Sequence, residues 1–147
     1  MTRECFVKPE QHAHPAPDSR LQQPLTAYLL RTLRARSQVS IELDIADCVS
    51  EEAVALFRPD LIVAPFLKRP VPESIWSRHC CLIVHPGPPG DRGPSALDWA
   101  IMNGESVWGV TVLQAEAEMD AGPVILQRRV PILPGDTADS LAARILE

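Results

Sequence analysis

Residues 60–85 read DLIVAPFLKRPVPESIWSRHCCLIVH. The two ends of this stretch, DLIVAPF over 60–66 and CCLIV over 80–84, are continuously apolar, which is typical of strands buried on both faces of a parallel sheet. Between them, PESIWSRH over 72–79 has a proline at the first position of a short predicted helix. A strand, a helix and a second strand in this order predict a parallel βαβ unit.

The same alternation continues on both sides of this stretch. The patterns predict a helix over 25–36, a strand over 39–45 and a helix over 50–57, and then, after residue 85, a helix over 96–104, strands over 107–115 and 123–132, and a helix over 136–146. Ser50 is the expected N-cap of the second helix, and Asp136 or Thr137 that of the last. This order predicts an α/β fold with an open, mostly parallel Rossmann-like sheet covered by helices on both faces.

The first 24 residues differ from the rest of the chain. They hold four of the 15 prolines and show no sustained hydrophobic period. We therefore expect an irregular N-terminal arm over 1–24. The 147 residues have the ordinary size of a single domain, so we expect one folded domain over 25–147.

Charge and composition exclude several classes of partner. The chain has 14 Lys and Arg against 19 Asp and Glu, a formal net charge of −5, so we expect no nucleic acid or membrane partner. No run approaches the roughly 18 apolar residues of a membrane span, and the N-terminus lacks the apolar core of a signal peptide. The four cysteines show no CxxC spacing, so we expect reduced thiols and a cytoplasmic protein. The adjacent residues His79, Cys80 and Cys81 would point in different directions, so we expect no metal site there.

His85 is the main candidate for chemistry because it directly follows the strand over 80–84. Ligands of open α/β sheets bind beyond the carboxyl ends of the strands, and the proline-rich loop HPGPPGDRGPS over 85–95 is stiff enough to hold a side chain in place. Asp120 lies in a second loop after a strand, and a carboxylate beside an imidazole can fix its tautomer. If both belong to one site, the two side chains must lie within about 8 Å of each other. The alternative for His85 taken alone is a hydrogen-bonded structural residue.

The neighbouring pair Asp91 and Arg92 has a simpler interpretation. Adjacent opposite charges in a loop favour a loop salt bridge over a catalytic pair. Trp99 and Trp108 are interpreted as packing residues of the core or the loops.

Together, the motifs HPG, DRGPSALDWAI and WGVTVLQAEAEMDAGP resemble the formyltransferase superfamily that uses 10-formyltetrahydrofolate. Within it, residues 39–147 are similar to the N-terminal formyltransferase-like domain of HypX proteins of hydrogenase maturation, where a crotonase-like domain follows. The tail, GPVILQRRVPILPGDTADSLAARI, is similar to glycinamide ribonucleotide formyltransferase.

The resemblance implies an enzyme of one-carbon metabolism, a hydroxymethyl- or formyltransferase acting on small molecules. The catalytic residues that match the family are His85 and Asp120, and 10-formyltetrahydrofolate is the implied donor, with no metal. The acceptor implied by HypX is a thiol such as coenzyme A, and the one implied by the tail is an amine such as glycinamide ribonucleotide. The implied folate-binding residues are Leu61, Ala64, Pro65, Phe66, Glu118 and Met119, and the implied acceptor-binding residues are Gly87 and Arg92. A crotonase-like domain, lost or separate, is the implied partner.

Two features depart from the superfamily pattern. Ile83 stands where the superfamily has an asparagine, although HypX-type sequences also have an aliphatic residue there. Residues 1–24 do not match the family's opening strand and loop, so either the chain is truncated or altered there or the sheet lacks its first strand. A non-catalytic folate-binding module, or a degenerate fragment of such an enzyme, is the alternative function, and formyl hydrolysis by water is a third.

Overall fold

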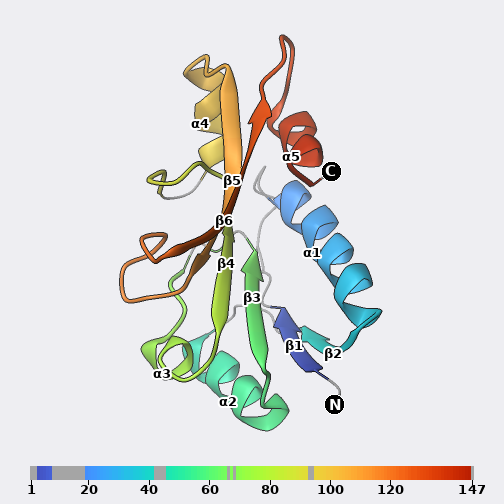
Figure 1. Cartoon of the computed structure of the whole chain (residues 1–147), viewed down its shortest axis with the longest axis vertical. Helices are drawn as coiled ribbons and strands as arrows, with labels where there is room; N and C mark the ends of the chain where they lie inside the picture. The colour runs from blue at the N-terminus through green and yellow to red at the C-terminus, as the bar shows by residue number, and fades with distance from the viewer. Residues whose placement is uncertain are drawn as a thin grey trace.

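The computed structural model describes residues 3–7, 19–41, 46–65, 67, 69–92 and 95–146. The elements in chain order are β1 (Arg3–Val7), α1 (Ser19–Arg34), β2 (Ser37–Ile41), α2 (Asp47–Phe57), β3 (Leu61–Pro65), α3 (Glu73–Trp76), β4 (Cys81–His85), α4 (Ala96–Met102), β5 (Val107–Gln114), β6 (Val124–Pro131) and α5 (Ala138–Leu146). Strands and helices alternate up to β5, as the patterns predict (Figure 1).

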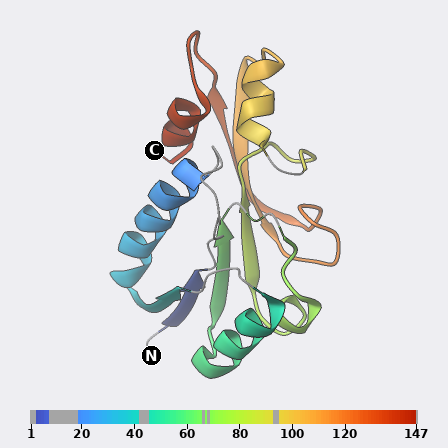
Figure 2. The ribbon, with the colours of Figure 1, turned by 180° about the vertical axis from the view of Figure 1, so that it is seen from behind.

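The described strands form one open sheet in the order β2-β1-β3-β4-β5-β6. The first four of these pair in parallel, whereas β5 and β6 are antiparallel to their neighbours. The predicted α/β fold with an open, mostly parallel sheet is therefore confirmed. In Figures 1 and 2, which view the sheet from opposite sides, α1 and α5 lie side by side.

The predicted irregular arm is wrong in two places. β1 lies inside residues 1–24 and pairs on both sides, with Cys5 opposite Val39 of β2 and Leu61 of β3, so the sheet has a strand before β2 in the chain. Helix α1 begins at Ser19 and continues through Pro24, where it forgoes one backbone hydrogen bond. β1 is only five residues long and opens with two charged residues, so it shows no readable period, and its place depends on its two neighbours.

The predicted cap of α2 is also wrong. The helix begins at Asp47 after Ala46, and Ser50 is buried in its second turn instead of capping it. Asp47 puts a negative charge in the first turn, where it favours helix formation. For the last helix, Thr137 is the cap, because its Oγ1 accepts a hydrogen bond from the Ser140 amide at 3.2 Å while the Ser140 hydroxyl accepts one from the Thr137 amide.

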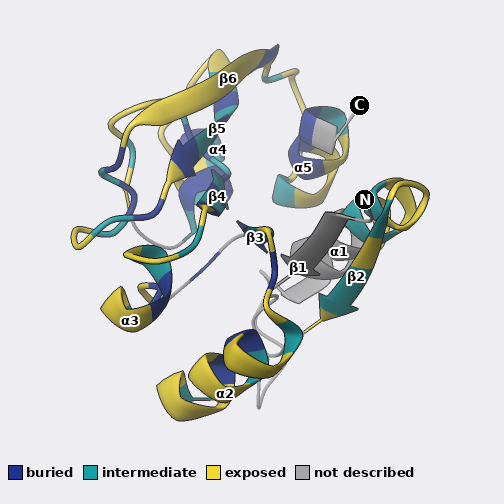
Figure 3. Cartoon of the chain, turned by 60° about the horizontal axis from the view of Figure 1, so that its bottom comes forward, coloured by how far each residue is buried: buried dark blue, intermediate teal, exposed yellow. Residues whose placement is uncertain are grey.

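Two apolar clusters hold the layers together. The larger joins α2 and α3 to the sheet and contains Val54, Ile62, Ala64, Leu67, Val71, Ile75, Cys81, Ile83, Leu113 and Ala115. The smaller joins α4, β6 and α5 through Leu97, Val130, Leu141, Ala142 and Ile145. Strand β6 is exposed along nearly its whole length (Figure 3), whereas β3, β4 and β5 carry several buried side chains each.

Candidate functional site

His85 is the last residue of β4, as the sequence predicts, and its side chain is buried. It lies opposite Thr111 of the antiparallel strand β5, and Ile83 lies opposite Leu113. Because side chains alternate along a strand and paired residues share a face, these four side chains lie on one face of the sheet. The end of β4 thus presents the imidazole beside the Thr111 hydroxyl, on a face that also carries the apolar Ile83 and Leu113.

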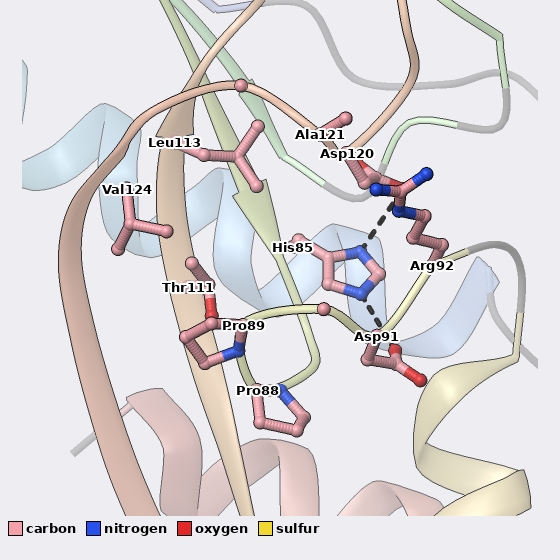
Figure 4. A pocket seen from close by; sticks show the side chains of 12 residues that line it. His85, Pro88, Pro89, Asp91, Arg92, Thr111, Leu113, Asp120, Ala121 and Val124 are labelled. Carbon is pink, nitrogen blue, oxygen red and sulfur yellow. Dashed lines mark hydrogen bonds and ion pairs between the residues drawn. The ribbon is translucent and has the colours of Figure 1, made fainter.

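The His85 ring lies between two carboxylates (Figure 4). Its Nε2 is 2.8 Å from Asp91 Oδ2, and its Nδ1 is 3.4 Å from Asp120 Oδ2. The predicted approach of His85 and Asp120 is therefore confirmed. A cationic imidazole can donate through both nitrogens, so this arrangement can hold the ring with each nitrogen directed at a carboxylate oxygen.

Asp120 reaches His85 by an indirect path. β5 runs opposite to β4, so its last residue, Gln114, lies beside Leu82, three residues back from His85. At about 3.4 Å per residue, the loop after β5 starts about 10 Å from the level of His85. The chain must therefore fold back across the sheet face to bring Asp120 to the imidazole.

A backbone hydrogen bond and a close backbone contact hold the loop between β5 and β6 in this folded-back path. The Gln114 amide donates to the Pro123 carbonyl at 3.0 Å, which closes the loop at its base. Gly122 is required there, since a Cβ at this position would lie 1.9 Å from the Gln114 carbonyl oxygen. Asp120 itself has a φ of 55°, in the left-handed region that aspartate tolerates better than most residues.

The loop after His85 is anchored to β5. Trp108 Nε1 donates to the Pro86 carbonyl at 2.8 Å, and the buried Thr111 hydroxyl donates to the Gly87 carbonyl at 2.7 Å. A turn then brings the Asp91 amide to the Pro88 carbonyl at 3.0 Å. These bonds direct Asp91 back toward the imidazole, so Trp108 holds the site loop as well as packing.

These two loops and β5 line a small open pocket of about 100 Å³. A water molecule occupies about 30 Å³ of liquid, so this space admits a formyl group and one reacting atom. Its lining residues are His85, Pro88, Pro89, Gly90, Asp91, Arg92, Thr111, Leu113, Asp120, Ala121, Gly122 and Val124.

The predicted salt bridge between Asp91 and Arg92 is wrong. Asp91 pairs with His85, and Arg92 pairs with Glu118 across the pocket. The proline-rich loop turns back on itself, so neighbouring residues face different partners. The contact of Asp91 with His85 is not predicted by the sequence patterns. Its signal in the sequence is a carboxylate six residues after the histidine, in a proline-rich loop that can reverse direction.

The other predicted site residues lie in different places. Three of the predicted folate residues belong to β3: Leu61 starts the strand, Ala64 is buried in the larger apolar cluster, and Pro65 ends the strand opposite Val84. Glu118 and Met119 directly precede Asp120 in the loop after β5. Phe66 lies outside the described residues. None of those that the structure describes lines the pocket itself. Among the predicted acceptor residues, Arg92 lines the pocket, and Gly87 lies against Asp91 and His85.

Ile83 is not a lining residue of the pocket either. It is 4% exposed and belongs to the larger apolar cluster. The position that carries an asparagine in the resembled superfamily is therefore part of the core in this chain.

Within the described ranges, no cluster of three or more His, Cys, Asp or Glu side chains is arranged to hold a metal ion. No helix in the same ranges combines the length and apolar character needed to cross a membrane.

Comparison with known proteins places this site in a family. The formyl transferase family matches residues 19–147. The hydrogenase maturation factor HoxX of Bradyrhizobium diazoefficiens is 58% identical over 109 residues, which cover 74% of this chain and 19% of that protein. A crystal structure of HypX from Aquifex aeolicus in complex with tetrahydrofolic acid superposes with a TM-score of 0.72 at 44% identity and covers 89% of this chain and 22% of that one.

A more distant structure shares the fold. Glycinamide ribonucleotide transformylase 1 from Symbiobacterium toebii has a TM-score of 0.70 at 24% identity, covering 99% of this chain and 81% of that one. The chain spans about a fifth of the length of the HoxX and HypX relatives, and the predicted resemblance to HypX-type formyltransferases is confirmed. From the match over most of its length, the chain belongs to the formyl transferase family.

Proposed function

We propose that this chain transfers a formyl group from 10-formyltetrahydrofolate to a thiol or an amine. The single observation that carries the proposal is the buried imidazole of His85, held between Asp91 and Asp120 at the wall of a pocket with room for a formyl group. The similarity to a HypX protein crystallised with tetrahydrofolic acid supports a folate as donor. For the acceptor, the resemblance to HypX implies a thiol such as coenzyme A, and the likeness of the tail implies an amine such as glycinamide ribonucleotide.

His85 does the central chemistry in this proposal. When the acceptor attacks the formyl carbon, negative charge develops on the formyl oxygen, and His85 donates a proton toward it. His85 then supplies the proton that the folate nitrogen needs when the bond to the formyl carbon breaks. Asp120 keeps the ring oriented through Nδ1 during these steps.

The donor and acceptor approach from two sides of the pocket in this proposal. The folate lies along the end of β3, at Pro65, and along Glu118 and Met119, which are continuous with Asp120 in the chain. The acceptor lies near Arg92 and Gly87 on the opposite loop. Because this chain covers only about a fifth of the HypX-type relatives, we assign further acceptor contacts to a separate domain, such as the crotonase-like domain implied by the resemblance.

Ile83 favours the alternative of a non-catalytic folate-binding module. With Ile83 in the core, no side-chain amide lies two residues before His85 to bind the formyl oxygen. Loss of one such donor typically costs about 10²–10³ in turnover. In the proposed enzyme, His85 carries this stabilisation without that amide.

The deciding experiment measures transfer from 10-formyltetrahydrofolate to coenzyme A and to glycinamide ribonucleotide, together with tetrahydrofolate binding. The parent should transfer to at least one acceptor, and His85→Ala should abolish transfer while folate still binds. His79→Ala is the matched control because His79 lies outside the pocket lining, and it should keep parent activity.

Three results would contradict the proposal. Folate binding without transfer would establish the binding module. Release of formate in place of a formylated acceptor would establish hydrolysis. Transfer that survives His85→Ala would show that His85 is not the catalytic residue.

A further inference from the structure

Asp91 differs from Asp120 in its exposure, although both contact the same ring. The Asp91 side chain is 26% exposed, and that of Asp120 is 3% exposed. Asp91 therefore contacts Nε2 from the open side of the pocket, whereas Asp120 contacts Nδ1 from the buried side. The two carboxylates are not equivalent partners of His85.

Both ring nitrogens face a carboxylate in this structure, so His85 can reach a formyl oxygen only after one carboxylate moves. The loop that carries Asp120 is closed by the hydrogen bond from Gln114 to Pro123 and is packed tightly at Gly122. Asp91 belongs to a loop at the pocket mouth and is the more exposed group. Nε2 is thus the nitrogen that a substrate can reach, and Asp91 is the group that must leave it.

Gly87 limits where Asp91 can go. A Cβ at Gly87 would lie 2.3 Å from Asp91 Oδ2 and 2.6 Å from His85 Nε2, so the backbone presses directly against this pair. Asp91 cannot retreat in that direction, but it lines the pocket and can turn into it. The pocket is also where the nucleophilic atom of an acceptor must approach the formyl carbon.

We propose that Asp91 is the general base that takes the proton from the acceptor. This inference rests on the proposed formyl transfer. In the donor complex, the formyl oxygen replaces Asp91 at Nε2, and the freed carboxylate turns toward the acceptor. The inference also defines the acceptor: it enters as a neutral thiol or amine that still carries its proton, because an anionic nucleophile would be repelled by the carboxylate.

The proton and bond changes balance without any further reactant. As the new bond from sulfur or nitrogen to the formyl carbon forms, the S–H or N–H bond breaks, and its proton moves to an Asp91 oxygen. As the bond from the formyl carbon to the folate nitrogen breaks, that nitrogen takes a proton from His85. Asp91 then returns its proton to His85 when their contact at Nε2 forms again, which restores the starting state.

Other charged groups surround Asp91. His85 contributes the imidazole from β4, and Arg92 is adjacent in the same loop. From the loop before β6, Asp120 lines the pocket and Glu118 pairs with Arg92. Arg92 is paired with Glu118, so the closest charged partner of Asp91 is His85. Replacing the Asp91 carboxylate should therefore affect the interactions of the His85 imidazole and of the bound acceptor.

If Asp91 only oriented the His85 ring, its replacement would have different effects from those expected if Asp91 is a general base. Asn at position 91 keeps the size of the side chain and offers an amide oxygen to Nε2, so it preserves orientation but cannot take a proton. If Asp91 is the base, Asp91→Asn should lower kcat by about 10²–10⁴, with little change in the KM for the donor. It should also remove the acid limb of the pH profile of kcat/KM.

The test uses the full chain with 10-formyltetrahydrofolate and either coenzyme A or glycinamide ribonucleotide. Activity lost in Asp91→Ala should return in proportion to added acetate, which replaces the missing carboxylate. Glu105→Gln is the matched control, because it removes an exposed carboxylate in the turn after α4, and it should behave as the parent.

Distinct results overturn the two proposals. An Asp91→Asn variant within about threefold of the parent kcat, or one that keeps the acid limb, overturns the role of Asp91 and leaves formyl transfer intact. Absence of transfer by the parent itself overturns the proposed function and this inference together.

Discussion

Replacing Ile83 by asparagine restores the residue of the resembled superfamily but places an amide in the core. Ile83 is 4% exposed and packs in the larger apolar cluster, opposite Leu113 on the neighbouring strand. Full burial of an isoleucine stabilises the folded state by about 1.5–3 kcal/mol, and an unpaired buried amide costs about 1–3 kcal/mol. The free energy of unfolding should therefore fall by about 3–6 kcal/mol.

This loss is large compared with the total stability of about 5–15 kcal/mol for an ordinary domain. A domain of this size loses roughly 2–4 °C in Tm per kcal/mol, so we expect a decrease of roughly 6–24 °C, measured by thermal and urea unfolding. Formyl transfer, measured at a temperature where the variant is folded, should be unchanged or lower. Ile83→Val, which shortens the side chain without adding polarity, should cost only about 0.5–1.5 kcal/mol.

Ile125→Asn is the matched control on the exposed strand β6. Ile125 is 58% exposed, so the same substitution there should lower Tm much less. An Ile83→Asn protein as stable as the parent would contradict the burial of this side chain in the core. An increase in formyl transfer would show that an amide at position 83 reaches the pocket.

Two further predictions concern the Asp91 loop and the start of α5. Gly87→Ala should displace Asp91 from Nε2, because the new Cβ would lie 2.3 Å from Oδ2, and should lower formyl transfer at least tenfold; unchanged ring-nitrogen NMR signals of His85 would contradict this. The pKa of Asp136 is lowered below its usual 3.8, chiefly by the hydrogen bond from Arg144 and also by those from the Leu133 amide and the Ser140 hydroxyl. A lowered pKa in the folded state stabilises the protein above about pH 4 and loses this effect as the pH falls. The difference in unfolding midpoint between the parent and Asp136→Asn should therefore shrink as the pH falls from 5 to 2.5. A difference that stays constant over this range would show that the lowered pKa of Asp136 does not stabilise the fold.

Much of the fold follows from local patterns. The apolar runs over 60–66 and 80–84 predict β3 and β4 because continuous apolar sequence is stable as a strand only where both faces are buried. The position of His85 at the end of β4 follows directly from that pattern, as does the helix after the loop. The family motifs add Asp120 as its partner.

The predictions failed where local pattern carries too little information. β1 has five residues and two initial charges, and it becomes a strand by pairing with β2 and β3. The cap of α2 was misplaced at Ser50, because serine is a good cap by propensity, but here its position in the helix faces the core. In both cases, packing against distant segments outweighed local preference.

The α/β order of elements, the strand that ends in His85 and the family motifs around the site can all be read from the chain, because hydrophobic period and turn residues act locally. Which side chains meet depends on the folded molecule. Because β5 runs antiparallel to β4, the loop that carries Asp120 begins about 10 Å from the level of His85. This loop must therefore fold back over the sheet face to bring Asp120 to the imidazole. The reversal of the proline-rich loop likewise separates Asp91 from its neighbour Arg92 and gives each a partner on another segment. Such contacts depend on register and loop closure across the whole sheet, and no local spacing encodes them.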